Sequence, residues 1–108
     1  METFNETIYV NKIEITNENL RYAEDGSKYI VIKYVNDEDN PTAYQIEWHV
    51  YPDDASRKLV EFVYDETNEI ATVNAIGTVV FKRKGAITVY VSATDGSSIS
   101  DKITIYAK

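Results

Sequence analysis

The clearest pattern in the chain is an alternation of apolar and polar positions with a period of two. In residues 44–51 the even positions are apolar or aromatic and the odd positions are mostly polar. A similar alternation recurs in residues 86–93 and 99–107. Because successive side chains of a strand point to opposite faces, each segment predicts a half-buried β-strand.

Turn signals separate these segments. Asp95-Gly96 lies between the last two and predicts a hairpin. Residues 28–35 follow Asp25-Gly26, are nearly continuously apolar, and predict a strand buried on both faces. Residues 36–42 are acidic and contain a proline. We expect them to form the solvated tip of one extended hairpin that pairs residues 28–35 with 43–50.

Weaker strand patterns fill the rest of the chain. They occupy residues 8–15, 59–64, 70–74 and 78–82. The first changes parity between Val10 and Ile13, which indicates a bulge or a switch of sheet. No helical stripe is present, and residues 53–58 could form at most a short helical turn. Short strands with regularly spaced turn signals predict a sandwich or barrel.

The second half of the chain carries a recognisable series of turn and strand motifs. They are, in order, Pro52-Asp53-Asp54-Ala55, Val60-Glu61-Phe62, Ile70-Ala71-Thr72-Val73, Gly77-Thr78-Val79, Gly85-Ala86-Ile87 and Asp101-Lys102-Ile103. This series resembles the bacterial Ig-like domain of group 2, and residues 51–108 carry the resemblance.

Two features depart from the family pattern. The usual Trp position holds Phe62, while the only Trp of the chain is Trp48, one strand earlier. The stretch before residue 52 is also longer than in the family. The resemblance implies an all-β, Ig-like β-sandwich of about seven or eight antiparallel strands, with the longer stretch forming the extended hairpin. We expect residues 8–108 to form this single domain and residues 1–7 to be an N-terminal arm.

Composition and charge narrow the function. The chain has no Cys, which excludes disulfides, zinc ribbons and thiol nucleophiles. Eleven Lys and Arg against eighteen Asp and Glu give a formal net charge of −7, which argues against nucleic-acid binding. No apolar run approaches the ~20 residues that span a bilayer, and the N-terminus lacks the features of a signal peptide. We expect neither a nucleic-acid nor a membrane partner.

Candidate chemistry is sparse. His49 is the only His, and as a base it would need an orienting group and a nucleophile nearby. Its position on the polar side of residues 44–51 predicts an exposed strand residue. The acidic runs at 37–39 and 53–54 lack the spacing of a calcium loop, so a cation site would have to be assembled from separate loops. We predict no catalytic, metal-binding or cofactor-binding residue, and calcium binding by an acidic loop stays open.

The tyrosines point instead to an interaction surface. Nine Tyr are too many for one small core, and Tyr51 and Tyr90 fall on the polar sides of their strands. Exposed Tyr is favoured in protein interfaces, although it also occurs on ordinary sheet surfaces. A basic run at 82–84 could contact an acidic partner or be a solvated turn. The predicted protein-binding residues are Phe4, Tyr51, Tyr90, Lys82, Arg83 and Lys84.

These features predict a non-catalytic structural or interaction protein. Domains of the family that the chain resembles occur on phage heads and tails and on bacterial surfaces. An initial Met, no export signal and no sister repeat favour a capsid accessory (decoration) protein on the virion, bound to the major capsid protein or another virion protein. The alternative is a module of a bacterial cell-surface adhesin or cell-wall protein, with carbohydrate or a host surface as further candidate partners. A small hydrolase is a distant alternative.

Overall fold

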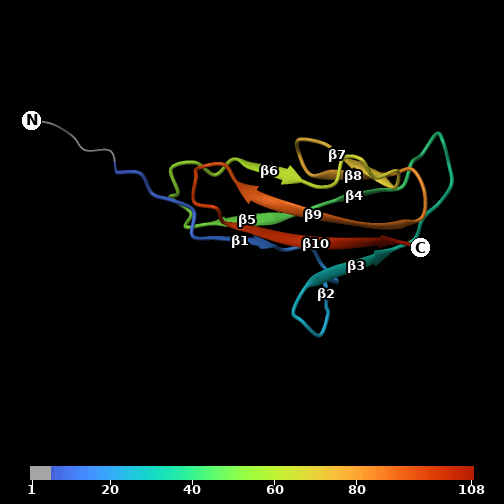
Figure 1. The fold of residues 1–108 in the computed structure, drawn as a ribbon, viewed down its shortest axis with the longest axis horizontal. Coiled ribbons are helices and arrows are strands. Elements are labelled where there is room, and N and C mark those ends of the chain that lie inside the picture. Colours follow the sequence, from blue (N-terminus) through green and yellow to red (C-terminus); the bar gives the residue numbers. More distant parts are fainter. Residues whose placement is uncertain (1–5) are drawn as a thin grey trace, which may run out of the picture.

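The computed structural model describes residues 6–108, and its regular structure there consists of strands alone (Figure 1). The strands are β1 (Lys12–Ile15), β2 (Arg21–Tyr22), β3 (Lys28–Ile32), β4 (Ala43–Gln45), β5 (Trp48–Tyr51), β6 (Val60–Val63), β7 (Ala71–Val73), β8 (Thr78–Phe81), β9 (Gly85–Ala93) and β10 (Ser100–Ala107). This range therefore holds no helix that could cross a membrane. Residues 53–58 form no helix beyond a single hydrogen-bonded turn, in which the Ala55 amide donates to the Pro52 carbonyl at 3.0 Å.

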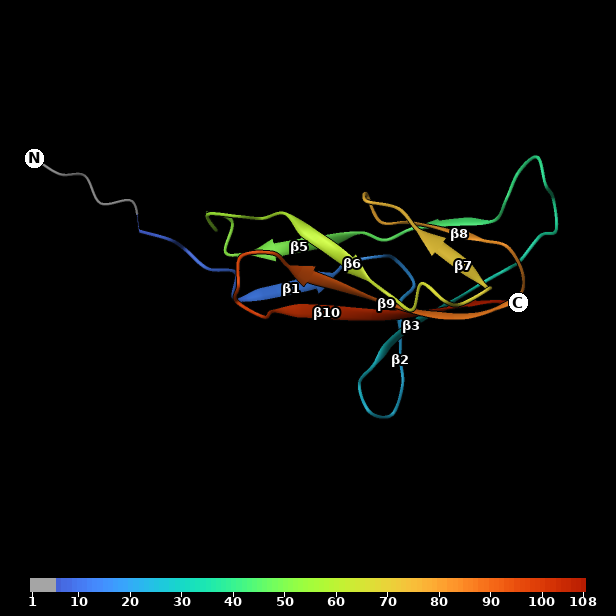
Figure 2. The same cartoon turned by 45° about the horizontal axis from the view of Figure 1, so that its top comes forward.

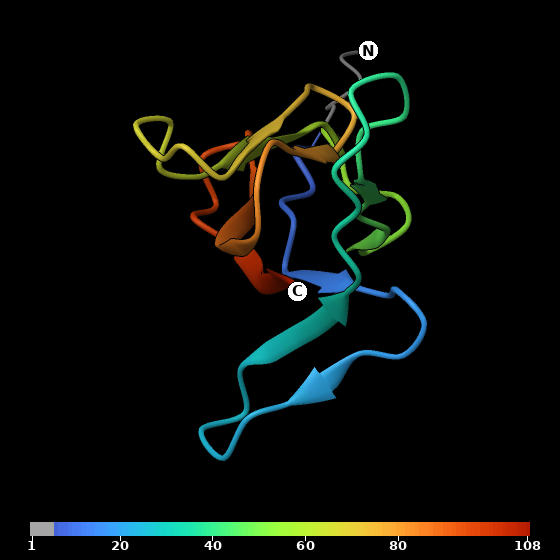
Figure 3. The ribbon, with the colours of Figure 1, turned by 90° about the vertical axis from the view of Figure 1, so that its right-hand side faces the viewer.

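The strands are arranged in layers around one apolar core. A five-stranded sheet has the order β2-β3-β10-β9-β6. Opposite it lie the three-stranded sheet β4-β8-β7 and the pair β1-β5; the chain runs directly from β4 into β5. Figure 3 shows this arrangement along the long axis, with the β2–β3 hairpin projecting from the body. The expectation of an all-β, sandwich-like fold is confirmed.

The β9–β10 hairpin forms the centre of the five-stranded sheet. Its inward side chains include Val89, Val91 and Ile103, each 0% exposed. The predicted strands at 86–93 and 99–107 are therefore confirmed, as is the hairpin between them. The loop is longer than a two-residue turn, and Gly96 adopts a positive φ of 86° within it, a conformation that Gly reaches without a steric penalty.

The expected extended hairpin is wrong. β3 pairs antiparallel with β2 and parallel with β10, so residues 28–35 do not pair with 43–50. One pair of the sheet is therefore parallel. β3 is also not buried on both faces: Ile30 is buried, but Val31 is 38% exposed. The apolar run predicted burial on both faces, but one face of β3 stays open because no element of the described chain covers it.

The predicted strand at 44–51 divides into two parts that pair with different sheets. β4 pairs with β8, and β5 pairs with β1. At the division the buried side chain of Asn17 takes the place of a neighbouring strand. Its Nδ2 donates to the Gln45 carbonyl at 2.8 Å, and its Oδ1 accepts from the Glu47 amide at 2.8 Å. The side chain of Asn17, distant in the sequence, thus bonds the backbone between β4 and β5. The alternation of residues 44–51 does not indicate this division.

The parity change in residues 8–15 is confirmed. Val10 and Ile13 are 3% and 4% exposed, while the two residues between them are exposed. The Val10 amide donates to Asp95 Oδ2 at 2.8 Å, on the β9–β10 loop. The Asn11 amide instead donates to the Tyr51 carbonyl at 2.8 Å. The chain therefore moves from one layer to the other between these residues.

Two aromatic rings pack between the layers. Trp48 on β5 meets Phe62 on β6 edge to face, with ring centroids 5.2 Å apart. The Phe62 ring in turn lies under Gly77, where a Cβ would come within 2.7 Å of Phe62 Cζ. Gly77 also has a φ of +84°. The turn before β8 thus needs glycine for both its backbone conformation and its close approach to the aromatic pair.

Candidate interaction surface

The outer side of the five-stranded sheet presents a continuous row of aromatic, aliphatic and hydroxyl side chains, which we call the tyrosine face. It follows from the strand register, because residues directly opposite one another share a face. Its members include Glu61 and Val63 of β6, Thr88, Tyr90 and Ser92 of β9, Ser100, Lys102, Thr104 and Tyr106 of β10, and Tyr29 and Val31 of β3. Figure 2 shows the four strands that carry it.

The apolar groups of this face are open to solvent. Val63, Tyr90 and Tyr106 are 46%, 41% and 38% exposed. The rings of Tyr29 and Tyr106 pack edge to face with centroids 5.9 Å apart. The hydroxyls of Thr88 and Thr104 are joined by a 2.8 Å hydrogen bond in the middle of the face.

Two shallow hollows lie along the tyrosine face. One, of about 320 Å³, is lined by Ala23, Tyr29, Val31, Tyr106 and Lys108. The other, of about 500 Å³, includes Val63, Thr88, Tyr90, Lys102 and Thr104 in its lining. Hollows lined by Tyr and Val suit protruding side chains of a partner protein, since Tyr combines a large contact area with a hydroxyl that can form hydrogen bonds.

The charge of this face differs from that of the whole chain. Lys102 lies directly opposite Tyr90 on the face, and Lys108 Nζ lies 5.9 Å from the Tyr106 ring centroid. The chain as a whole carries a net charge of −7. An acidic partner surface would therefore be attracted near Tyr90 and Tyr106, whereas Glu61 at the β6 edge of the face carries the opposite charge.

The structure separates the predicted interface residues. Tyr90 is on the tyrosine face, but Tyr51 is half-buried on β5 in the opposite layer. The Tyr51 ring lies 4.4 Å from the His49 ring and 5.4 Å from Lys12 Nζ, measured between ring centroids and to the ring centroid respectively. These two tyrosines cannot belong to one contiguous patch. Phe4 lies outside the described residues.

The basic run follows β8 at one end of the molecule. Lys82, Arg83 and Lys84 line an open hollow of about 600 Å³ together with Tyr34 and Asn36. The Tyr34 hydroxyl donates to the Lys82 carbonyl at 2.8 Å. Arg83 Nη1 lies 3.4 Å from Glu69 Oε2, and both side chains are largely exposed. Such an ion pair contributes little to stability, so it leaves the run available to solvent.

Sequence reasoning did not identify most of the tyrosine face. Tyr106 could have been found, because it alternates with the buried Ile105 and Ala107. Tyr29 and Val31 could not, since their strand was expected to be covered on both sides. Val63 needed the pairing of β6 with β9, which places it opposite Tyr90.

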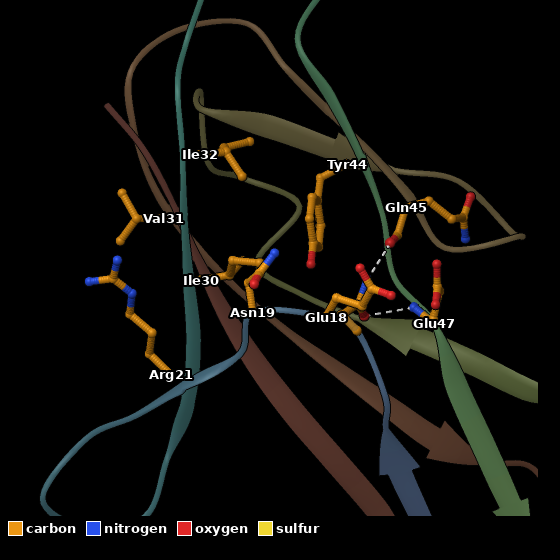
Figure 4. Close-up of a pocket in the computed structure, with 10 residues that line it drawn as sticks. Glu18, Asn19, Arg21, Ile30, Val31, Ile32, Tyr44, Gln45 and Glu47 are labelled. Carbon is orange, nitrogen blue, oxygen red and sulfur yellow. Dashed lines mark hydrogen bonds between the residues drawn. The ribbon is translucent and has the colours of Figure 1, made fainter.

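A polar groove lies between β3 and the β4–β5 junction (Figure 4). It has a volume of about 590 Å³, and its lining includes Glu18, Arg21, Tyr44 and Glu47. Burial, and then the negative charge of Glu47, raise the pKa of Tyr44. The amide of Asn17, also in the lining, is already engaged by the backbone on either side of Ile46.

The groove does not contain the only His of the chain. His49 lies on β5 with 47% of its side chain exposed, and its Nε2 is 2.7 Å from Asp53 Oδ1. The prediction of an exposed strand residue is confirmed. Within residues 6–108, no group of three or more His, Asp or Glu side chains is arranged to hold a metal ion.

No family model matches the chain, and no curated protein matches its sequence.

Proposed function

We propose that the chain is a non-catalytic interaction module that binds a larger protein body through the tyrosine face. The observation that carries this proposal is the exposure of Val63, Tyr90 and Tyr106 on one regular sheet face. The paired strands of the sheet hold the backbone of these residues in place, so binding costs less conformational entropy than ordering a loop. Lys102 adds a positive charge for an acidic partner surface.

We propose further that the fold is an Ig-like sandwich. In that fold three strands lie in the order C-F-G in one sheet, and four lie in the order A-B-E-D in the other. The order β6-β9-β10 corresponds to the first group. The pairings β1 with β5, β4 with β8, and β8 with β7 correspond to the second, with β4 and β5 together acting as strand B. This correspondence supports the resemblance of residues 51–108 to the bacterial Ig-like domain of group 2.

The setting we propose is the surface of a phage capsid, with the major capsid protein or another virion protein as the partner. A decoration protein needs a stable fold and a binding face, and no reaction chemistry. The tyrosine face would bind one specific virion protein.

Mass spectrometry of purified virions from cells that carry the gene tests this proposal. The chain should be present in a fixed ratio to the major capsid protein. Tyr90→Ser and Tyr106→Ser should each weaken binding of added protein to virions at least about tenfold, because central Tyr residues often dominate interface energies. Tyr22→Ser is the matched control, since Tyr22 is 63% exposed on β2 and pairs with Lys28 on the other face of the sheet.

Two results would overturn the proposal. The chain could be absent from virions and present instead on the bacterial cell surface. Alternatively, both tyrosine-face variants could bind as tightly as Tyr22→Ser, which would exclude this face as the binding surface.

A further inference from the structure

The outer edge of β6 carries backbone groups that face away from the sheet. Among the strands of residues 6–108, β6 is the last of the five-stranded sheet and has a partner, β9, on one side only (Figure 1). The Ala93 amide donates to the Ile99 carbonyl at 2.9 Å, so the backbone polar groups of Ala93 point toward β10. Val60 lies opposite Ala93. In an antiparallel pair such a residue directs its own N–H and C=O away from the neighbour.

A second contact fixes the same alternation. The Leu59 carbonyl accepts from Thr94 Oγ1 at 2.7 Å, on the β9 side. Because backbone groups alternate along a strand, Val60 and Phe62 present their N–H and C=O groups to the open side. Open edges of this kind are templates for another strand.

The charged residues on the two sides of β6 have opposite signs. Basic Arg57-Lys58 come before β6, and acidic Asp65-Glu66 come after it. All four side chains are exposed. Exposed apolar groups lie between them, with Leu59 62% and Val63 46% exposed. When two copies of such a strand run antiparallel, the basic end of each meets the acidic end of the other.

We infer that β6 pairs antiparallel with β6 of a second copy of this chain. The two five-stranded sheets then form one continuous sheet of ten strands. Two tyrosine faces adjoin across the new seam, with Val63 and Tyr90 of each copy near it. This pairing does not depend on the capsid partner proposed above.

The charges select the register. A twofold axis at Phe62 places Val60 opposite Tyr64 of the second copy. Just beyond the ends of β6, it brings Lys58 toward Glu66 in the turn that follows the strand. It also lets the outward groups of Phe62 form a reciprocal pair of hydrogen bonds. A twofold axis at Glu61 would bring Arg57 toward Asp65, but it would also oppose two like carboxylates within the paired strands, which is unfavourable in a cross-strand pair. The axis therefore lies at Phe62.

Charge reversal tests the pairing in solution. The wild-type chain should dimerise in a concentration-dependent way in sedimentation velocity. Lys58→Glu and Glu66→Lys should each raise the dimer dissociation constant roughly tenfold, since each replaces two attractions by two repulsions. An equimolar mixture of the two variants restores both attractions, so it should associate as tightly as the wild type.

The controls change the same charges at the opposite edge of the sheet. Lys33→Glu and Glu24→Lys should leave the dissociation constant unchanged, because β2 and β3 lie farthest from β6. A wild-type chain that stays monomeric at every concentration would overturn the inference. So would a mixture of the β6-edge variants that associates no better than either variant alone.

Cysteine pairs test the register, since the chain has no native Cys. With the axis at Phe62, residue 61 of one copy lies directly opposite residue 63 of the other. A mixture of Glu61→Cys and Val63→Cys should therefore form a disulfide-linked heterodimer faster than either variant links to itself. Faster linkage of Glu61→Cys to itself would overturn the register at Phe62.

Discussion

The two layers of the molecule are held together by different means. The five-stranded sheet is built mainly from long backbone ladders, and β9 pairs with β10 over eight successive residue pairs. The opposite layer consists of strands no longer than four residues. There, side-chain amides form hydrogen bonds with backbone groups that have no partner in a neighbouring strand.

Asn17 and Gln45 show how the short-strand layer is joined. Asn17 bridges the two sides of the β4–β5 division with hydrogen bonds of 2.8 Å. Gln45 Nε2 donates to the Ile46 and Ile76 carbonyls at 2.9 and 2.8 Å. The comparison teaches that one layer draws its stability from repetition and the other from a few specific residues. A single substitution should therefore do more damage in the short-strand layer.

The largest effect is expected from Asn17→Ala. It leaves a carbonyl and an amide without their partner at a buried position, and each such loss costs about 1–3 kcal/mol. We expect the free energy of unfolding in urea to fall by about 3 kcal/mol. Asn11→Ala is the control, because the Asn11 side chain is exposed; it should change stability by less than about 0.5 kcal/mol. Equal effects of the two substitutions would contradict the bridging role of Asn17.

Gly77→Ala should have the next largest effect. The new Cβ would meet Phe62 Cζ at 2.7 Å in a backbone with a φ of +84°. We expect a loss of about 2 kcal/mol, from the sum of backbone strain and displacement of the ring. Gly26→Ala has a similar φ of +86° but open space around it, so it isolates the strain at about 1 kcal/mol. Thermal unfolding measures the difference in stability between Gly77→Ala and Gly26→Ala. Equal losses would show that the Phe62 ring moves aside at no cost.

Thr88→Val tests the long-ladder layer. It removes the 2.8 Å hydrogen bond to Thr104 in the centre of the sheet. The backbone ladder remains, and Val has a high strand propensity, so we expect a change of at most about 0.5 kcal/mol. Urea unfolding is the measurement. A loss as large as that of Asn17→Ala would remove the contrast between the two layers.

The smallest effect concerns the acid side of the pH profile. Hydrogen bonds from the Ser97 side chain and then from the Val10 amide lower the pKa of Asp95 below its ordinary value of 3.8. The charged carboxylate therefore favours the folded state above pH 3.8, and this contribution is lost as pH falls through the lowered pKa.

Asp95→Asn should accordingly be less stable than the wild type at neutral pH, and the difference should shrink on acidification. Chemical unfolding at neutral and acidic pH measures it. Asp25→Asn is the comparison, because hydrogen bonds from Ser27, within the same turn, lower the pKa of Asp25. A difference between Asp95→Asn and the wild type that is independent of pH would show that the Asp95 charge contributes nothing to folding.

Alternation predicted the layers well but not their connections. It identified β9, β10 and the segment of β4 and β5, because a period of two is a local property of the sequence. The partner of each strand is a non-local property. Nothing in residues 28–35 indicates that β3 lies beside β10, more than seventy positions later in the register.

The candidate surface was predicted in part for the same reason. Tyr90 was found from its place on one strand, and the structure surrounds it with Val63 and Lys102 from two others. Tyr51 was predicted by the same argument, but its ring packs against His49 and Lys12. A surface patch is assembled across strands, so a residue's own strand shows which way it points and not which residues surround it.

The position of β10 has a consequence for how the chain matures. This strand stands between β3 and β9, yet it is the last of the ten to be made. Neither β3 nor β9 can form its hydrogen bonds to β10 until residues 100–107 have left the ribosome. The five-stranded sheet is therefore completed only after residues 100–107 have been synthesised. Until then β3 and β9 both have an unpaired edge. A nascent chain stalled before residue 100 would therefore be prone to aggregate with other copies.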